Sequence, residues 1–455
     1  MEFRDFLQQN IVRLDGGMGT LLQQAGLPFG ELPERWNITH SETVSNIHRD
    51  YFNAGSDVVC TNTFGANILK FSEAELEQII ACAVKNARNG ADRSQGEREK
   101  FVALDIGPTG KLLKPFGDLA FENAVEIFAK TVRLGVKYGV DLIFIETMSD
   151  CYETKAALLA AKENSTLPVL VCNAYGADGK LMTGASPAAM VAMLEGMGVD
   201  GLGANCSLGP KQLKTVVEEL LERASVPVVV KPNAGLPQTD GENVFYETDA
   251  CAFSRDVADF VRLGARAVGG CCGTTPAYIQ ALCSAIENVQ PVPVTNKNVA
   301  CISSYTHAVA LNKPCVIGCR LCPTQNVDFQ KALQEGDMDY ALDEGIDQQD
   351  QGADILLVNV GLPTIDEEKI LQEYVEALQS VVRVPLLIQT NNASALEKAL
   401  RVYNGKPLVC VADGDKESMR KILPLLQKYG GEILSSDCSQ MREVYQKYLS
   451  LQKEK

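Results

Sequence analysis

Three cysteines in the sequence stand where a metal site could form. Cys271 and Cys272 are adjacent, follow a short apolar run and are flanked by glycines in GGCCGTT, residues 269–275. Cys206 ends another apolar run in GANCSLGP, residues 203–210. Neighbouring side chains of a strand point to opposite faces, so the pair can serve one site only where the strand ends and the chain turns. Three thiolates from two strand ends form a ligand set that suits zinc and leaves a fourth position open.

The cysteine pair alone is equally compatible with two buried structural cysteines, and the third cysteine favours the metal site. The chain has 15 cysteines and begins MEFRDFL, which does not resemble an export signal. We therefore expect a cytoplasmic protein, where clustered cysteines more often bind metal or do chemistry than form disulfides. Only three histidines are present, which disfavours acid–base catalysis by histidine and a metal site built from histidines.

Composition narrows the class of protein further. The chain is 46% hydrophobic and 22% charged, with a net charge of −16. Such a balance is typical of a globular protein, and no apolar run is long enough to cross a membrane. The negative charge disfavours nucleic acids and anionic membranes as partners.

Eight short apolar runs, each followed by a loop and a stretch of helical periodicity, must position the cysteines. They are Ile11–Asp15, Asp57–Asn62, Phe101–Gly107, Asp141–Thr147, Pro168–Ala174, Val199–Cys206, Val226–Asn233 and Ala265–Cys272. Apolar strands that alternate with helices indicate a parallel sheet covered by helices. Eight units in about 280 residues predict an α/β fold of the (β/α)8 barrel type, with its active site at the carboxyl ends of the strands.

Each run ends in a side chain capable of chemistry. These side chains are Asp15, Asn62, Asp105, Glu146, Asn173, Cys206, Asn233, and Cys271 with Cys272. Strands six, seven and eight are neighbours in such a barrel. Cys206, Asn233 and the cysteine pair are therefore expected to meet at one rim.

Two domains are predicted, 1–290 and 314–455, joined by a proline-punctuated linker at 291–313. The second region has five further strand-like runs. They are Cys315–Cys319, Asp354–Val360, Pro385–Gln389, Pro407–Val411 and Glu432–Ser435. Five strands are too few for an eight-stranded barrel, so we expect a half-barrel or a small open α/β layer, followed by a charged helix over Gln440–Lys455.

Six stretches in the first 290 residues resemble the homocysteine S-methyltransferase family, most closely the homocysteine module of cobalamin-dependent methionine synthases. They are LDGGMGT at 14–20, TNTFGAN at 61–67, IETM at 145–148, GANCS at 203–207, KPNAG at 231–235 and GGCCGTT at 269–275. The resemblance implies zinc on Cys206, Cys271 and Cys272, with homocysteine as the substrate. It implies that Asp15 and Glu146 bind the substrate and take part in catalysis.

The resemblance implies that nearby groups complete the substrate site. These groups are Gly16, Gly17, Ser207 and Asn233. Zinc would favour the thiolate of homocysteine at neutral pH, which is the form that attacks a methyl group. Glu146 can pair with the substrate's ammonium group and so orient it. The alternative for Glu146 is a strand-end carboxylate paired with a lysine, and Asn233 can offer a neutral oxygen beside the metal when substrate is absent.

The second region resembles a partial pterin-binding barrel, although most of the polar residues that hold a pterin in that family are replaced. The replacements are Cys319, Cys322, Leu357, Gln389, Cys410 and Asp413, and Asn359 is nearly alone among the retained polar residues. Folate binding is therefore not expected. Cys315, Cys319 and Cys322 have the C-x3-C-x2-C spacing of radical enzymes with an iron–sulfur cluster. Three alternatives stay open for these cysteines: an iron–sulfur cluster, a second metal site, or small, soft residues that have no ligand role.

The sequence thus predicts a zinc-dependent enzyme that methylates homocysteine to methionine. Methylcobalamin on a separate corrinoid protein is the expected donor, because the chain lacks the Asp-x-His-x-x-Gly pattern of a cobalamin ligand. A small donor such as S-methylmethionine or a betaine is one alternative. The other is a docking or scaffold subunit that retains the fold without turnover.

Overall fold

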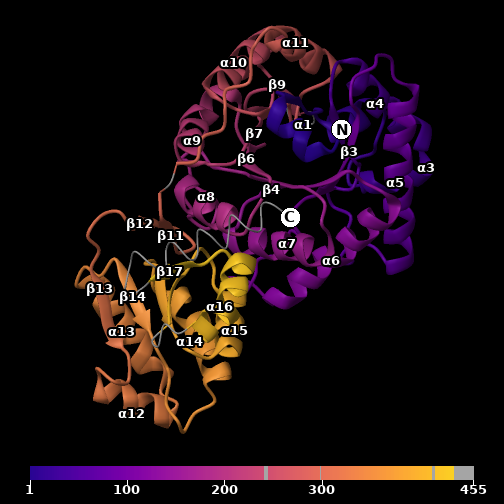
Figure 1. Cartoon of the computed structure of the whole chain (residues 1–455). Helices are drawn as coiled ribbons and strands as arrows, with labels where there is room; N and C mark the ends of the chain where they lie inside the picture. Colours follow the sequence, from indigo (N-terminus) through magenta and orange to yellow (C-terminus); the bar gives the residue numbers. More distant parts are fainter. Residues whose placement is uncertain (240–243, 298, 412–415, 435–455) are drawn as a thin grey trace. The chain divides into compact units, whose positions relative to one another are not determined.

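The computed structural model describes residues 1–239, 244–297, 299–411 and 416–434. The chain divides into two compact units (Figure 1). The first comprises residues 1–183 and 199–297, and the second comprises 184–198 and 298–455. Helix α8 (Pro187–Gly196) follows strand β5 of the first unit in the chain but belongs to the second unit.

Eight parallel strands form the centre of the first unit. They are β1 (Val12–Arg13), β2 (Val58–Cys60), β3 (Phe101–Ile106), β4 (Leu142–Met148), β5 (Val169–Asn173), β6 (Gly201–Asn205), β7 (Val228–Lys231) and β10 (Ala267–Val268). Their order is β1-β10-β7-β6-β5-β4-β3-β2, and a parallel bridge between Leu14 and Val58 joins the two ends. The sheet is therefore a nearly closed barrel, which confirms the predicted (β/α)8 fold and all eight strands.

Helices surround these strands (Figure 1). They are α2 (Met18–Gln24), α4 (Ser41–Asn53), α5 (Glu73–Arg93), α6 (Phe121–Tyr138), α7 (Cys151–Asn164), α9 (Pro210–Arg223), α10 (Ala250–Leu263) and α11 (Pro276–Ile286), with short turns η1 (Pro33–Arg35) and α3 (Trp36–Thr39). Ser72, Asp150 and Asp249 cap the amino ends of α5, α7 and α10 through their side-chain oxygens. Helix α6 ends at Tyr138 and is followed by the capping residue Gly139, which adopts the left-handed conformation with φ 84°.

The barrel interior is filled from its amino end. Helix α1 (Phe3–Gln9) contributes Phe3, Phe6 and Leu7 to the interior cluster, which also includes Phe101 at the start of β3. The Phe101 ring centroid lies 5.2 Å from that of Phe3 and 5.3 Å from that of Phe6. Since α1 and this aromatic cluster close one end, polar side chains inside the barrel lie towards the carboxyl ends of the strands.

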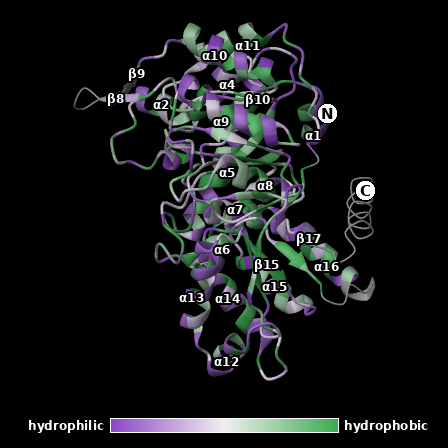
Figure 2. Ribbon diagram, turned by 90° about the vertical axis from the view of Figure 1, so that its left-hand side faces the viewer, coloured by the Kyte–Doolittle hydropathy of each residue, from purple (hydrophilic) through white to green (hydrophobic). Residues whose placement is uncertain are grey.

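The second unit contains a parallel sheet of five strands. They are β13 (Ile317–Leu321), β14 (Ile355–Val358), β15 (Leu386–Gln389), β16 (Leu408–Cys410) and β17 (Glu432–Leu434), paired in chain order. Its helices are α12 (Val327–Glu335), α13 (Met338–Asp350), α14 (Glu367–Val381), α15 (Ala393–Val402) and α16 (Lys416–Tyr429). Hydrophobic residues dominate strands such as β15, in keeping with the hydropathy colours of Figure 2. The five predicted strands are confirmed, whereas the predicted helix over Gln440–Lys455 lies outside the described residues.

Two antiparallel hairpins were not predicted, because strands of three residues leave little periodic pattern. One pairs β8 (Pro237–Thr239) with β9 (Val244–Tyr246), and the other pairs β11 (Cys301–Ser303) with β12 (Ala308–Ala310). The β11–β12 hairpin lies within the stretch expected to be a linker, and it belongs to the second unit. None of the described helices is both long and apolar enough to cross a membrane.

Candidate metal centre and substrate site

The three predicted cysteine ligands lie together at the carboxyl ends of β6 and β10. The sulfur atoms of Cys206, Cys271 and Cys272 are all within 4.8 Å of one another, and Cys206 Sγ lies 3.9 Å from Cys272 Sγ. A tetrahedral zinc ion with Zn–S bonds of about 2.3 Å separates its sulfur ligands by about 3.8 Å. The trio therefore fits zinc, and no other group of three candidate ligands within the described ranges is so close together.

The end of strand β7 holds all three ligands by their backbone amides. Cys206 donates its N–H to the carbonyl of Lys231 at 3.0 Å, and Cys271 donates to the carbonyl of Pro232 at 2.9 Å. The N–H of Cys272 donates to Asn233 Oδ1 at 3.1 Å. Three consecutive residues thus position the two cysteine loops from the strand that lies between β6 and β10. The predicted residue Asn233 contributes here as an acceptor for the backbone of a ligand.

The turn after β6 has a strained backbone. Cys206 and Ser207 have φ values of 56° and 55°, in the left-handed region that non-glycine residues seldom occupy. Thr147, directly after Glu146 on β4, has φ 62°. Asn205 connects the two strained positions: its Oδ1 accepts from Thr147 N at 2.8 Å, and its Nδ2 donates to Thr147 Oγ1 at 2.8 Å. The side-chain amide of Asn205, which is buried, thus connects the turn that carries Cys206 to the backbone beside Glu146.

Sulfur–sulfur hydrogen bonds distribute the charge of the trio unequally. Hydrogen bonds from Cys206 and Cys271 hold the pKa of the Cys272 thiol well below its usual range, and the Tyr246 hydroxyl contributes a further one. The Tyr246 ring also covers Gly273, where a Cβ atom would lie 2.4 Å from the ring. Tyr246 was not among the predicted site residues, because it reaches the site from the β8–β9 hairpin.

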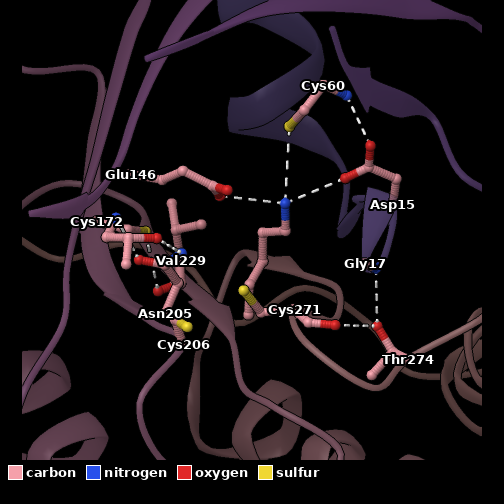
Figure 3. Close-up of polar contacts among 12 residues, drawn as sticks. Asp15, Gly17, Cys60, Glu146, Cys172, Asn205, Cys206, Val229, Cys271 and Thr274 are labelled. Atoms are coloured by element: carbon pink, nitrogen blue, oxygen red, sulfur yellow. Dashed lines mark hydrogen bonds and ion pairs between the residues drawn. The ribbon is translucent and has the colours of Figure 1, made fainter. Parts of the chain in front are cut away.

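Inside the barrel, two predicted carboxylates face a lysine. The Nζ atom of Lys231 lies 3.1 Å from Asp15 Oδ1 and 3.2 Å from Glu146 Oε2. It also lies 3.6 Å from Cys60 Sγ and 5.1 Å from the centroid of the Phe144 ring. In Figure 3 the dashed lines from Asp15, Cys60 and Glu146 converge on this one nitrogen. Lys231 belongs to a recognised motif but was not predicted as a site residue.

Burial governs the charges in this cluster. The side chains of Lys231, Asp15 and Glu146 are 3%, 2% and 9% exposed. Burial raises the pKa of the Glu146 carboxyl, and the nearby ammonium of Lys231 opposes that shift. The alternative of a strand-end carboxylate paired with a lysine is thus present in this structure.

The remaining predicted residues have structural contacts of their own. Gly17 donates its N–H to Thr274 Oγ1 at 3.1 Å, and a Cβ atom on Gly17 would lie 2.8 Å from the carbonyl oxygen of Cys271. A Cβ atom on Gly16 would lie 2.6 Å from Thr274 Oγ1. The two glycines therefore allow the loop after β1 to approach the cysteine loop. Ser207 is exposed beside Cys206.

Cys315, Cys319 and Cys322 of the second unit pack on one apolar cluster but do not form a three-sulfur group. Cys319 Sγ donates to the Ile317 carbonyl at 3.4 Å, Cys322 Sγ lies 3.2 Å from Thr324 Oγ1, and Cys315 Sγ donates to the Lys313 carbonyl at 3.3 Å. They are not among the grouped candidate metal ligands of the described residues. The C-x3-C-x2-C spacing is therefore not accompanied by a preformed three-sulfur cluster.

The fold and the site together define a (β/α)8 barrel protein with three clustered cysteines at its rim and a buried charged cluster in its interior. The sequence matches the family model described as homocysteine S-methyltransferase over residues 12–286. The chain belongs to the homocysteine S-methyltransferase family, as its motifs predicted.

Two curated relatives and one solved structure illustrate the likeness. The chain is 27% identical to methionine synthase of Mycobacterium tuberculosis, over 95% of this chain and 38% of that protein. It is 29% identical to methionine synthase of Mycobacterium leprae, over 94% of this chain and 38% of that protein. The chain thus spans well under half the length of these relatives. The metallated form of the homocysteine methyltransferase MmuM from Escherichia coli shares the fold, with TM-score 0.53 and 23% identity over 62% of this chain and 99% of that one.

Proposed function

We propose that this chain transfers a methyl group to the sulfur of homocysteine and so forms methionine, with zinc held by Cys206, Cys271 and Cys272. The observation that carries the proposal is the gathering of three cysteine sulfurs within 4.8 Å at the rim of a barrel of this family. Zinc, when bound, favours the thiolate form of a thiol at neutral pH and thereby supplies a nucleophile.

The chain's own residues orient the substrate in this proposal. Glu146 has one carboxylate oxygen on Lys231 and another available for the ammonium group of an amino acid. Asp15 follows β1, which only β10 separates from β7, and it fixes Lys231 through Oδ1. With the amino acid held in place, the sulfur attacks the methyl carbon as the bond from that carbon to its carrier breaks. The bonding electrons stay with the carrier, and the thiol proton leaves to solvent.

Methylcobalamin on a separate corrinoid protein is the proposed donor. Large apolar side chains are exposed in loops directly after β2, β3, β5 and β7, all at the end of the barrel that carries the cysteines. They are Phe64, Phe116, Met182 and Leu236, and they are 40–66% exposed. Exposed apolar groups gathered at one end suit contact with a protein surface better than entry of a small water-soluble donor. A small donor and a scaffold without turnover are the alternatives.

Two further expectations remain part of the proposal. Domains at 1–290 and 314–455 with a linker at 291–313 are proposed; the β11–β12 hairpin falls within these linker bounds, although it packs as part of the second compact unit. A cytoplasmic location is proposed because three thiols must stay reduced to bind a metal.

The test compares zinc content and turnover in cysteine variants. Zinc-loaded protein is assayed for methionine formation from homocysteine with methylcobalamin, and separately with S-methylmethionine and with betaine. Cys206→Ser, Cys271→Ser and Cys272→Ser should each lose zinc by elemental analysis and lose turnover. Cys251→Ser, at the exposed start of α10, is the matched control and should keep both.

Each outcome has a distinct meaning. Full zinc retention in Cys272→Ser would contradict the ligand assignment. Turnover with S-methylmethionine but not with methylcobalamin would show that the proposed methyl donor is wrong and that homocysteine remains the acceptor. Absence of turnover with every donor, in protein that holds zinc and binds homocysteine, would favour the scaffold.

A further inference from the structure

A third carboxylate lies in the barrel interior beside the two predicted ones. Phe101 and Ala103 of β3 belong to the interior cluster, and Asp105 is the next residue with the same orientation. Glu146 follows Leu142 and Phe144 of β4 in the same way, and Lys231 follows Val229 of β7. Alternate positions on three strands therefore place Asp105, Glu146 and Lys231 in one charged layer above the apolar interior.

The three carboxylates of this layer differ in how many of their oxygen atoms accept a hydrogen bond from the protein. Both oxygens of Asp15 have partners, because Oδ1 accepts from Lys231 and Oδ2 accepts from Cys60 N at 2.7 Å. Glu146 uses Oε2 for Lys231. Asp105 is 7% exposed, and its Oδ1 is fully buried without a hydrogen-bond partner among the described residues.

The layer is short of positive charge. Asp15 and Glu146 both pair with the ammonium of Lys231, whereas Asp105 forms no ion pair within the described part of the chain. Burial and the nearby Glu146 carboxylate raise the pKa of Asp105 well above its ordinary value. A buried carboxyl without a donor is stabilised either by a proton or by a cation. An arriving ammonium group would supply both the missing positive charge and the missing donors.

We infer that Asp105, together with the free oxygen of Glu146, receives the ammonium group of the substrate, and that Asp15 and Lys231 are positioning residues. Asp105 is paired with Phe144 in the β3–β4 register, and Glu146 is the next residue of β4 on the same face, so the two carboxylates are diagonal neighbours on adjacent strands. Lys231 fixes one oxygen of Glu146, and Asp15 fixes Lys231. This assignment rests on the proposed function and adds to it a residue that selects amino-bearing thiols.

The test measures binding of two thiols to zinc-loaded protein by calorimetry. Homocysteine carries the ammonium group, and 4-sulfanylbutanoate is the same molecule without it. Asp105→Asn keeps the shape of the side chain and removes its charge. Homocysteine should bind about 10- to 100-fold more weakly to this variant, the loss expected for one charge-assisted hydrogen bond, while the affinity for 4-sulfanylbutanoate stays unchanged.

Asp57→Asn is the matched control. Asp57 is also a buried aspartate of the barrel, but it lies at the amino end of β2, accepts from Arg13 N at 2.9 Å and pairs with Arg98. Its substitution should leave the relative affinity for the two thiols unchanged. Circular dichroism verifies that each variant is folded, and Asp105→Ser provides the same comparison should the asparagine variant aggregate.

Equal losses for both thiols in the Asp105 variants would mean a structural role and would overturn the inference. Unchanged homocysteine affinity would overturn it as well, and Glu146 would then bind the ammonium without Asp105. Wild-type protein that holds zinc but binds neither thiol would overturn the proposed function, and with it this assignment.

Discussion

The two parallel sheets of this chain end in polar and sulfur-bearing side chains, but they connect those side chains differently. In the barrel, Lys231 of β7 contacts Asp15 after β1, Cys60 of β2 and Glu146 of β4. In the second unit, Asn359 after β14 donates to Gln389 of β15 at 3.0 Å, and Gln389 donates to Cys410 of β16 at 3.8 Å. One set of contacts crosses an interior, and the other runs between neighbouring strands.

The difference follows from closure of the sheet. A barrel brings side chains of distant strands to a common interior, so residues far apart in sequence can form one compact charged site. Neighbouring strands of an open sheet can satisfy each other's polar groups, which leaves fewer groups for a ligand. Equal topology of strands and helices therefore does not imply equal capacity to bind a substrate.

Among the tests of this difference between the sheets, the largest loss of unfolding free energy is expected for Lys231→Met in the barrel. It removes the ammonium from between two buried carboxylates, and breaking such a buried pair typically costs about 3–5 kcal/mol of unfolding free energy. Urea unfolding of the variant measures the loss. Lys214→Met is the matched control, since that lysine is 61% exposed and pairs with Glu218 on the surface. A loss as small as that of the control would show that Lys231 does not hold the charged layer together.

A smaller effect is expected for Asn205→Ala, which cuts the connection between the Cys206 turn and Thr147. Two hydrogen bonds are lost, each worth about 0.5–1.5 kcal/mol, and the strained backbone at Thr147 and after β6 is no longer held. Urea unfolding and a zinc competition titration should both show weakening. Asn164→Ala at the end of α7 is a control that removes a hydrogen bond to the Ala160 carbonyl in the outer helix layer. Zinc affinity unchanged in both variants would contradict the connection.

A third expected effect is a pH dependence of the unfolding free energy that arises from the Asp105 carboxyl. Its pKa is raised in the folded protein, so the unfolded chain releases this proton at lower pH than the folded chain. The contribution to stability is then present below about pH 4 and is lost as the pH rises towards the folded-state pKa, by at most about 1.4 kcal/mol per pH unit. Urea unfolding across this range should show a shallower decline for Asp105→Asn than for wild type. Parallel curves would show that Asp105 titrates normally.

Much of this architecture was predictable because it depends on local pattern. Continuous β-branched runs indicated all thirteen strands of the two parallel sheets, and the strand-end positions of Cys206, Cys271 and Cys272 predicted their convergence. Lys231 could have been placed from its spacing of two residues from the buried Val229. Tyr246 could not, because it comes from a hairpin inserted between β7 and α10. The hydrogen-bond state of Asp105 depends on neighbouring strands and could not be obtained from the sequence.

The smallest expected effect concerns the second unit, which we expect not to bind methyltetrahydrofolate. A pterin presents a fixed edge of donors and acceptors, and each buried group left without a partner costs about 1–3 kcal/mol. Leu357 is buried in an apolar cluster with Leu387 and Leu408, and it offers the pterin no hydrogen bond. Asn359 and Gln389 would have to give up their mutual hydrogen bond before either could bind the ring.

Calorimetric titration with methyltetrahydrofolate tests this expectation. Homocysteine titrated into the same zinc-loaded preparation verifies that the protein is folded and able to bind its proposed substrate. Three or four unpaired groups would weaken a micromolar site beyond the millimolar range, since each 1.4 kcal/mol changes affinity about tenfold. Saturable binding tighter than about 100 micromolar that disappears in Asn359→Ala would contradict it. Such a result would show that side chains hydrogen-bonded between neighbouring strands can exchange their partners for a pterin. The two sheets would then differ in which ligand they bind and not in their capacity to bind one.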